Sequence, residues 1–343
     1  MPHNERKRIW PVITVLFILL FASMYLHLTS GAFTISTVDV FKTLFRLHEV
    51  DNFDLIIFDM RLPRIVTAAI VGVGLALAGV VLQGLTKNGL ADPGILGINS
   101  GAGFSVVMFM FFFQFQLVDA QINSIAKIII VPLFGFVGGV LAAAIILVIS
   151  YKNMRMDVQK LILTGIAINS GFAALTLYFS LKMNEDDYQA AAIWMNGSIY
   201  NANWYFVIAM LPWIIILSIF VFRKKHLLDY FQLEEDNIVG LGIHLEKEKI
   251  ILLLLSVGLV SASVSVSGSI GFIGLMAPHI ARQLVGIHHR NVMPVSMLIG
   301  AVLLVFSDYI AKNIFAPAEV SVGIVVSIIG IPYFLYLLVK SKG

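Results

Sequence analysis

Residues 61–103 read RLPRIVTAAIVGVGLALAGVVLQGLTKNGLADPGILGINSGAG, and this stretch decides the fold class. Two arginines, Arg61 and Arg64, precede a charge-free run of small and apolar residues, and a loop rich in Gly, Pro and Asn follows it. A second apolar run begins directly after the loop. Irregular backbone at membrane depth is tolerated only where protein or a water-filled path covers it. The stretch therefore predicts the wall of a membrane transporter.

The composition indicates the same class. The 343 residues are 59% hydrophobic and 13% charged, whereas about a quarter of the residues in soluble domains are charged. The chain has no cysteine, which excludes disulfides, thiol catalysis and Cys-ligated metals. The net charge of +3 is spread over loops and forms no basic patch, so nucleic-acid binding is not expected. We predict an all-α polytopic membrane protein, with one transmembrane permease domain over residues 1–343.

About ten transmembrane helices are predicted, and we interpret the first as a retained span, because its charge-free run exceeds the roughly 7–15 residues of a signal peptide's apolar region. The spans are expected at residues 10–30, 62–85, 94–116, 124–150, 159–181, 203–222, 250–268, 270–286, 293–311 and 321–339. Ten spans place both termini on one side. That side holds sixteen Lys and Arg residues and the other side seven. The positive-inside rule thus predicts cytoplasmic termini.

Two connecting segments carry amphipathic patterns. In the outer loop 31–60, apolar residues on one helical face predict a short helix on the membrane surface, with Ser36 or Thr37 as its cap. In the inner segment 223–248, a short helix is expected near residues 233–239, ended by Gly240 and Gly242. This inner helix is either a solvated connector or an element that fills a groove in a cytosolic partner.

Each of the remaining features has either two interpretations or a purely structural one. The loop from Lys87 to Gly103 is either an ordinary helix-capping loop or the lining of a gate. Small residues at four-residue spacing in the second span favour tight packing within one chain over a dimer interface. Residues 250–281 predict two spans that meet at a tight outer turn. His279 is expected to pack rather than to bind metal, and Asp308 and Lys312 to form an i,i+4 pair.

Four stretches closely resemble FecCD-type ABC permeases, the membrane subunits of importers for ferric siderophores, haem and cobalamin. They are RLPR (61–64), LAGVVLQGLTKNGLADPGILGINSGAG (77–103), GSIGFIGLMAPHIAR (268–282) and AEVSVGIVVSIIGIPYFLYLL (318–338). The resemblance covers nearly the whole chain in order. It implies the ten-span fold of a type II ABC importer permease, a second permease subunit, two cytoplasmic ATPase subunits and an external substrate-binding protein.

The resemblance also implies roles for particular residues. Those that dock the binding protein would be Arg61, Arg64 and Lys312. Those at the inner gate of the translocation path would be Asn99, Ser100, Asp157, Val158 and Gln159. Those that couple to the ATPase would lie within residues 225–242, among them Leu233, Glu234, Glu235, Asp236, Asn237, Gly240 and Gly242. The family has Asn-Pro-Leu-Ala where this chain has Asn88-Gly89-Leu90-Ala91, which predicts a more flexible loop.

These expectations describe a permease subunit that carries a ferric siderophore across the bacterial plasma membrane, with haem or cobalamin as alternative cargo. No catalytic residue, metal site or cofactor is expected on this chain, because ATP and Mg²⁺ would bind the partner ATPase. The second permease is either an identical chain or a paralogue. The rival class is an ion-coupled secondary transporter, which would need buried ionisable residues; His27, Asp308 and His279 are the few candidates. A membrane enzyme is not indicated, since motifs such as H-E-x-x-H and G-x-S-x-G are absent from the sequence.

Overall fold

The structure is a computed structural model that describes residues 3–31, 33–47, 51–119, 124–152, 155–314, 316 and 318–340. These residues form helices and one short antiparallel hairpin. The elements in chain order are α1 (His3–Thr29), α2 (Thr37–Leu44), α3 (Asp51–Asp54), η1 (Leu55–Arg61), α4 (Leu62–Thr86), η2 (Pro93–Leu96), α5 (Ile98–Asp119), α6 (Ser124–Ser150), β1 (Tyr151–Lys152), β2 (Arg155–Met156), α7 (Val158–Ser180), α8 (Glu185–Met195), α9 (Trp204–Arg223), α10 (Lys225–Tyr230), α11 (Glu235–Gly240), α12 (Leu245–Ser267), α13 (Ile273–Val285), α14 (His289–Asn313) and α15 (Val322–Lys340).

Every predicted span has a helix. Within the described residues, eight helices are long and apolar enough to cross a membrane, and the two remaining predicted positions are occupied by α5, whose shorter apolar part is Ile98–Phe113, and by the 13-residue α13. The predicted all-α polytopic fold is thus confirmed. An additional helix, α8, lies between the fifth and sixth spans; its 11 residues reach only about 16 Å, too short to cross a bilayer.

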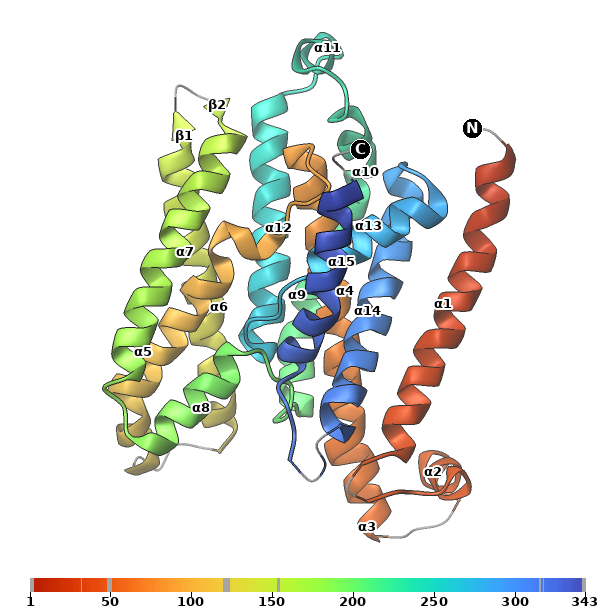
Figure 1. Ribbon diagram of the computed structural model, residues 1–343, viewed down its shortest axis with the longest axis vertical. Helices are drawn as coiled ribbons and strands as arrows, with labels where there is room; N and C mark the ends of the chain where they lie inside the picture. The colour runs from red at the N-terminus through yellow and green to blue at the C-terminus, as the bar shows by residue number, and fades with distance from the viewer. Residues whose placement is uncertain are drawn as a thin grey trace.

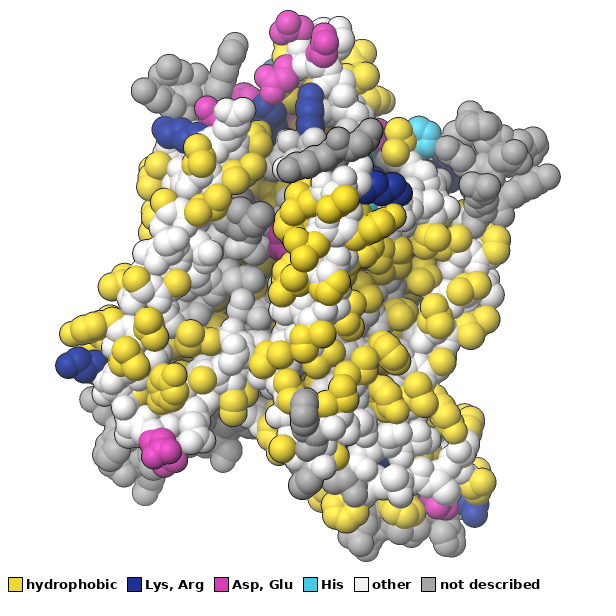
Figure 2. All heavy atoms as spheres, in the orientation of Figure 1, with side chains coloured by type: hydrophobic (Ala, Val, Ile, Leu, Met, Phe, Trp, Pro, Cys, Tyr) yellow, Lys and Arg dark blue, Asp and Glu magenta, His cyan; other side chains and the backbone are white. Residues whose placement is uncertain are grey.

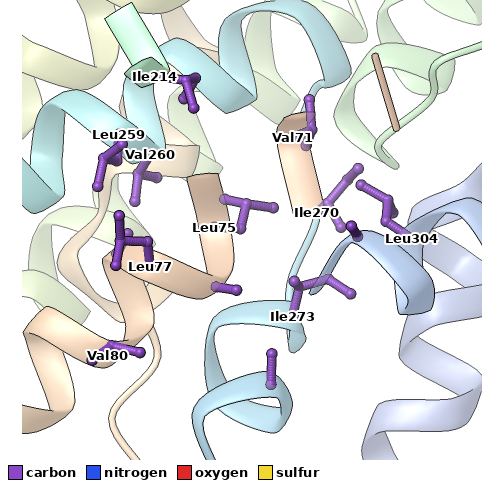
Figure 3. Packing of buried hydrophobic residues seen from close by; sticks show 14 of the residues in the cluster. Val71, Leu75, Leu77, Val80, Ile214, Leu259, Val260, Ile270, Ile273 and Leu304 are labelled. Atoms are coloured by element: carbon purple, nitrogen blue, oxygen red, sulfur yellow. The ribbon is translucent and has the colours of Figure 1, made fainter. Parts of the chain in front are cut away.

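The core of the fold is built around α4. Of the 18 most apolar consecutive residues in this span, 78% are buried, because α9, α12, α13 and α14 all pack against α4. Figure 3 shows α4 side chains such as Val71 and Leu75 beside Ile273 of α13 and Leu304 of α14. A span buried this deeply faces protein on nearly all sides, which explains why its sequence is apolar without a polar stripe.

Glycines let α4 approach its neighbours closely. A methyl group at Gly72 would collide with the carbonyl oxygen of Gly300 on α14, and one at Gly79 would collide with that of Gly274 on α13. Small residues at helix crossings replace the hydrophobic driving force that lipid does not supply. The structure thus confirms the predicted use of these residues for packing within one chain.

The helices form two groups and the molecule has two distinct ends (Figure 1). Helices α5, α6 and α7 stand side by side, with α8 across one end, while the other spans gather around α4. The start of α1, the end of α15, the hairpin and α11 lie at one end, here termed the α11 end, and α2, α3 and α8 lie at the other, the α2 end. Most charged side chains visible in Figure 2 lie at these ends, and apolar side chains cover the middle.

The predicted short helix in the loop 31–60 is confirmed as α2. The Ser36 hydroxyl caps it by accepting from the amide of Asp39 at 3.2 Å. Val40 and Thr43 face the protein, while Val38, Phe41 and Phe45 are exposed. Its position on a membrane surface stays a prediction.

The α12–α13 turn differs from expectation, because it is internal rather than at the outer surface. Ser267 and Gly268 are buried, and the Ser267 carbonyl accepts from the amide of Ser198 at 2.8 Å. A side chain at Gly268 would collide with the carbonyl oxygen of Trp194. The segment that follows α8 therefore covers this turn.

Candidate translocation path and its buried supports

A cluster of buried charges joins four parts of the chain at the α2 end. Arg64 of α4 donates from Nε and Nη2 to both carboxylate oxygens of Asp308 on α14, at 2.7 and 2.9 Å. Its Nη1 donates to Glu319, in the segment before α15, at 2.7 Å. His27 Nε2 of α1 lies 2.7 Å from Asp308 Oδ2. Because the side chains of His27 and Asp308 are 0% and 1% exposed, these charges satisfy one another rather than solvent.

Two further cations hold the end of α1. Arg61 donates to the carbonyl oxygens of Leu28 and Phe33, and Lys312 Nζ donates to that of Ser30 at 3.1 Å. The last carbonyls of a helix have no partner within the helix and carry its negative dipole end. Arg61 and Lys312 therefore neutralise the C-terminus of α1 and fix it against α4 and α14.

The structure brings the three predicted docking residues together and gives each of them partners within this chain, while their role in docking stays a prediction. Arg61 and Arg64 are only 5% and 7% exposed, so their side chains do not form a charged outer surface in this chain. The predicted i,i+4 pair of Asp308 and Lys312 is wrong. Asp308 pairs with Arg64 and His27, and Lys312 donates to a backbone carbonyl instead. The cause is tertiary, because α1 and α4 supply closer partners than the next turn of α14.

The loop after α4 is tied to the start of α13. Asp92 accepts from the amide of Gly94 at 2.7 Å and from the amide of Phe272 at 3.1 Å. The first bond caps η2, and the second joins the sequence stretch 77–103 to the stretch 268–282. Phe272 has a φ of +64°, a left-handed conformation that costs a non-glycine residue energy and needs support from its surroundings. Asp92 supplies part of that support.

Gln83 on α4 reinforces the same junction. Its Nε2 lies 3.2 Å from the carbonyl oxygen of Ala91 and 3.3 Å from those of Gly274 and Leu275, while Arg282 donates to its Oε1. Loop, α4 and α13 thus form one hydrogen-bonded unit. Both interpretations of the loop retain support, since it caps helices and also lies against α7.

The two predicted gate residues at the start of α5 are half-buried. The Ser100 hydroxyl donates to the carbonyl of Gly97 at 3.0 Å, a local capping bond. The Asn99 side-chain oxygen is buried and finds no hydrogen-bond partner among the described residues. An unpaired buried oxygen costs free energy, so Asn99 is the residue of this pair with unused capacity to bind.

The other predicted gate residues lie at the beginning of α7. Asp157 caps the helix by accepting from the amides of Gln159 and Lys160, at 2.9 and 3.1 Å, and Val158 is half-buried. The loop approaches α7 farther along, where a methyl group at Gly97 would lie 3.5 Å from the carbonyl oxygen of Gly165. Eight residues of helix separate Asp157 from that point, or about 12 Å. The structure therefore places the two sets of gate candidates at different heights of α7.

Helix α7 exposes polar groups within its span. Only 17% of its apolar window is buried, and Asn169, Ser170 and Gly171 are all exposed near its middle. The Ser170 hydroxyl is satisfied by the carbonyl of Ile166 at 3.0 Å. Exposed amide and backbone polarity at this position is unfavourable against lipid tails. This surface of α7 is suited to water or to another protein chain.

At the α11 end, ion pairs hold the segment between α9 and α12 in place. Lys224 pairs with Glu248, and Lys249 pairs with Glu235 at 2.7 Å. Asp229 Oδ1 accepts from the backbone amide of His289 at 2.9 Å and from its Nδ1 at 2.7 Å. Burial alone would raise the pKa of Asp229, but the hydrogen bonds from His289 outweigh burial and hold the pKa below its ordinary value.

The predicted coupling residues lie on or beside α11, which projects from this end (Figure 1). Val239 and Leu241 are 59% and 60% exposed, whereas Ile238 is 1% exposed and anchors the helix. Lys87 Nζ, at the start of the loop after α4, donates to the carbonyl of Leu233 at 2.6 Å. This bond joins the segment that carries α11 to the loop after α4.

The sequence indicated only part of the buried supports. The available signal is two isolated ionisable residues in apolar runs, His27 and Asp308, whereas the sequence does not show that Arg64 is the partner of Asp308. His279 packs as expected, with its ring near Tyr333 and its Nε2 2.9 Å from Gln283 Nε2. Across the described ranges, no three His, Asp or Glu side chains are grouped to hold a metal ion.

Known proteins resemble this chain over nearly its full length. FeuC, the permease protein of an iron-uptake system in Bacillus subtilis (strain 168), is 49% identical over 318 residues, covering 93% of this chain and 94% of the relative. FhuG, the permease protein of an iron(3+)-hydroxamate import system in the same organism, is 41% identical, covering 96% and 97%. A solved metal-chelate type ABC transporter in an inward-facing conformation superposes with a TM-score of 0.82 at 29% identity, covering 96% of this chain and 99% of its own.

The bundle around α4, the hydrogen-bonded loop and these similarities define an ABC-type membrane permease. The family model of the FecCD transport family matches residues 17–340, and the chain belongs to that family. The predicted family and fold are thus confirmed.

Proposed function

We propose that this chain is the permease subunit of an ATP-driven importer for ferric siderophores in the bacterial plasma membrane, with both termini cytoplasmic. The cargo is inferred from the relatives, which include the iron-uptake, iron-hydroxamate and iron-citrate permease proteins of Bacillus subtilis. The charge distribution over the loops supports the orientation. The α11 end is then the cytoplasmic end.

The exposed polar surface of α7 is the structural observation that carries the transport role. A second permease chain beside Asn169, Ser170 and Gly171 would close a path between two such surfaces. The loop at Gly97 lies against the same helix and forms the constriction, with Asn99 as the polar residue free to bind. Asp157, Val158 and Gln159 line the cytoplasmic exit, about 12 Å below.

Partner ATPase subunits supply the energy by engaging the α11 segment. Val239 and Leu241 present the exposed apolar contact, and Lys87 links this segment to the gate loop. ATP and Mg²⁺ bind the partner, and its closure shifts the path between outward-open and inward-open states. At the α2 end, Arg61, Arg64 and Lys312 fix the ends of α1, α4 and α14, which form the frame that a substrate-binding protein docks on.

Uptake of radioactive iron tests the function in a strain that lacks this gene and carries it on a plasmid. A ferric hydroxamate, ferric citrate and haemin are the probes. We expect uptake of a ferric siderophore, loss of uptake when ATP is depleted with the proton gradient intact, and persistence with an uncoupler. Uptake that stops only with the uncoupler would show a secondary transporter instead, and uptake of haemin alone would correct the cargo.

A further inference from the structure

A groove of about 850 Å³ runs between α1, α4, α9 and α14, away from the α7 surface. Its walls are almost entirely apolar, with Leu20 of α1, Ile70 of α4, Ile215 of α9 and Met297 of α14 among them. Helices α1 and α9 are only 17% and 28% buried over their apolar windows, so both face the bilayer. Helix α1 leans away from its neighbours toward the α11 end, which leaves the groove flanked by lipid (Figure 1).

Three basic side chains line the α11 end of the groove. They are Arg223 at the end of α9 and Lys225 and His226 at the start of α10. None of the three has an ion pair or hydrogen bond within the part of the chain that the structure describes. Lys224, between them, is paired with Glu248 and is not part of the lining. Among the described residues, the groove thus changes from apolar walls to two unpaired cations, Arg223 and Lys225, with His226 beside them.

A buried hydroxyl lies between these two zones. Ser218 lines the groove and is 8% exposed, and its Oγ has no hydrogen-bond partner among the described residues. It precedes Arg223 by five residues, which is about 7.5 Å along the helix. A serine in a span normally bonds to a carbonyl of its own helix, so a free hydroxyl here has unused capacity to donate to a ligand.

From this order of apolar wall, hydroxyl and cations, we infer that the groove binds an anionic phospholipid of the surrounding bilayer. One acyl chain lies along Ile70 and Ile215, an ester oxygen accepts from Ser218, and the phosphate lies between Arg223 and Lys225. Basic pockets between spans at a membrane surface are the typical sites for anionic headgroups. A helix of another copy would cover the same apolar wall but leave both cations without a counter-ion, which is unfavourable.

The binding site is preformed, because α10 is held from two sides. Leu228 is fully buried, and Asp229 is bonded to His289 at the start of α14. Bound lipid would therefore stabilise the junction of α9 and α10, from which the α11 segment projects. The inference concerns lipid binding itself and does not depend on the transported substrate.

Contact quenching by brominated lipids tests this site. The chain has no cysteine, so a fluorophore can be attached at Ile215→Cys alone before the permease is combined with its ATPase. The full-length permease, purified with its ATPase, is placed in phosphatidylcholine bilayers that contain brominated phosphatidylglycerol or brominated phosphatidylcholine. We expect preferential quenching by phosphatidylglycerol. In Arg223→Gln/Lys225→Gln this preference falls about 25-fold, because each basic residue near the membrane surface increases the affinity for an anionic lipid about fivefold.

Three comparisons make the outcome decisive. Lys247→Gln removes an exposed cation outside the groove and leaves the preference unchanged, and a fluorophore on Leu141→Cys of α6, where Leu141 is 57% exposed, shows no preference. Ala69→Phe fills the groove and lowers quenching by both lipids. Equal quenching of the labelled Ile215→Cys chain by the two lipids would overturn the inference, as would a preference that survives the addition of Arg223→Gln/Lys225→Gln in folded protein.

Discussion

Arg64 of α4 and Asp308 of α14 form a bidentate ion pair, with N–O distances of 2.7 and 2.9 Å, in which the Asp308 side chain is 1% exposed. His27 adds α1 to this pair and Glu319 adds the segment before α15. The RLPR motif therefore holds the α2 end together from inside. Its charges stabilise the contacts of α4 with α1, α14 and the segment before α15.

The first prediction concerns this pair. Asp308→Asn leaves Arg64 with Glu319 alone, and Arg64→Gln leaves Asp308 with His27 alone; removing one partner of a buried ion pair costs up to about 3–5 kcal/mol. We expect either change to lower the free energy of unfolding by that amount, measured by tryptophan fluorescence in mixed micelles. Arg46→Gln is the matched control, because Arg46 pairs with Asp54 at 2.6 Å but is 62% exposed. That exposed pair contributes about 1 kcal/mol or less. Equal effects of the buried and exposed changes would refute the structural role.

The second prediction concerns the loop after α4. The family has proline where Gly89 stands, and a side chain at Gly89 would meet nothing within 4 Å. Gly89 is the second residue of a turn closed by the Ala91 amide and the Asn88 carbonyl, and its φ is not positive, so Gly89→Pro should fit and stabilise by about 0.4–1 kcal/mol through the unfolded chain.

Gly97→Ala is the contrasting change in the same loop. Gly97 has a φ of +66°, and a methyl group there would lie 3.0 Å from Ile146 Cδ1. The left-handed conformation alone costs a residue with a Cβ about 1–2 kcal/mol. The midpoint temperature of thermal unfolding should therefore be higher than that of the wild type for Gly89→Pro and lower for Gly97→Ala. A fall for both would show that the loop needs glycine at residue 89 as well.

The third prediction concerns pH. The pKa of Asp229 is lowered in the folded chain, so its bond to His289 contributes stability above the ordinary Asp pKa of about 3.9. That contribution is lost as the pH falls through the lowered pKa. Asp229→Asn should therefore unfold at a lower temperature than the wild type at pH 7, and the difference should shrink below about pH 4. Asp236→Asn on the exposed surface of α11 serves as the control. A difference that is constant from pH 7 to pH 3 would contradict the charged hydrogen bond.

The fourth prediction separates partner binding from folding on α11. Val239→Asp and Leu241→Asp change side chains that are 59% and 60% exposed, so folding should be unaffected. Apolar residues that are exposed in the free chain contribute to the free energy of binding when a partner buries them. We therefore expect loss of ATPase co-purification and of substrate-stimulated ATP hydrolysis. Ile238→Asp, at a site 1% exposed, should instead destabilise the permease itself. Normal ATP hydrolysis with both exposed variants would show that α11 is only a connector.

The number and position of the spans could be predicted because hydropathy over about 20 residues is a local property. The same holds for α2 and for the small residues of α4, whose spacing along one helix is visible in the sequence. The internal α12–α13 turn could not be predicted, because its cover comes from the segment after α8. Local patterns do not show which distant segment will pack over a turn.

The sequence by itself thus determined the class, the order of the helices and the family, since these depend on composition and on motifs continuous in the chain. Only the tertiary structure decided the partners of the charges. Arg64 and Asp308 are 244 residues apart in sequence, and the desolvation of both in one interior makes them pair. The same folding leaves Arg223 and Lys225 without an ion pair among the described residues, beside an apolar groove, a contrast that no local pattern of basic residues could reveal.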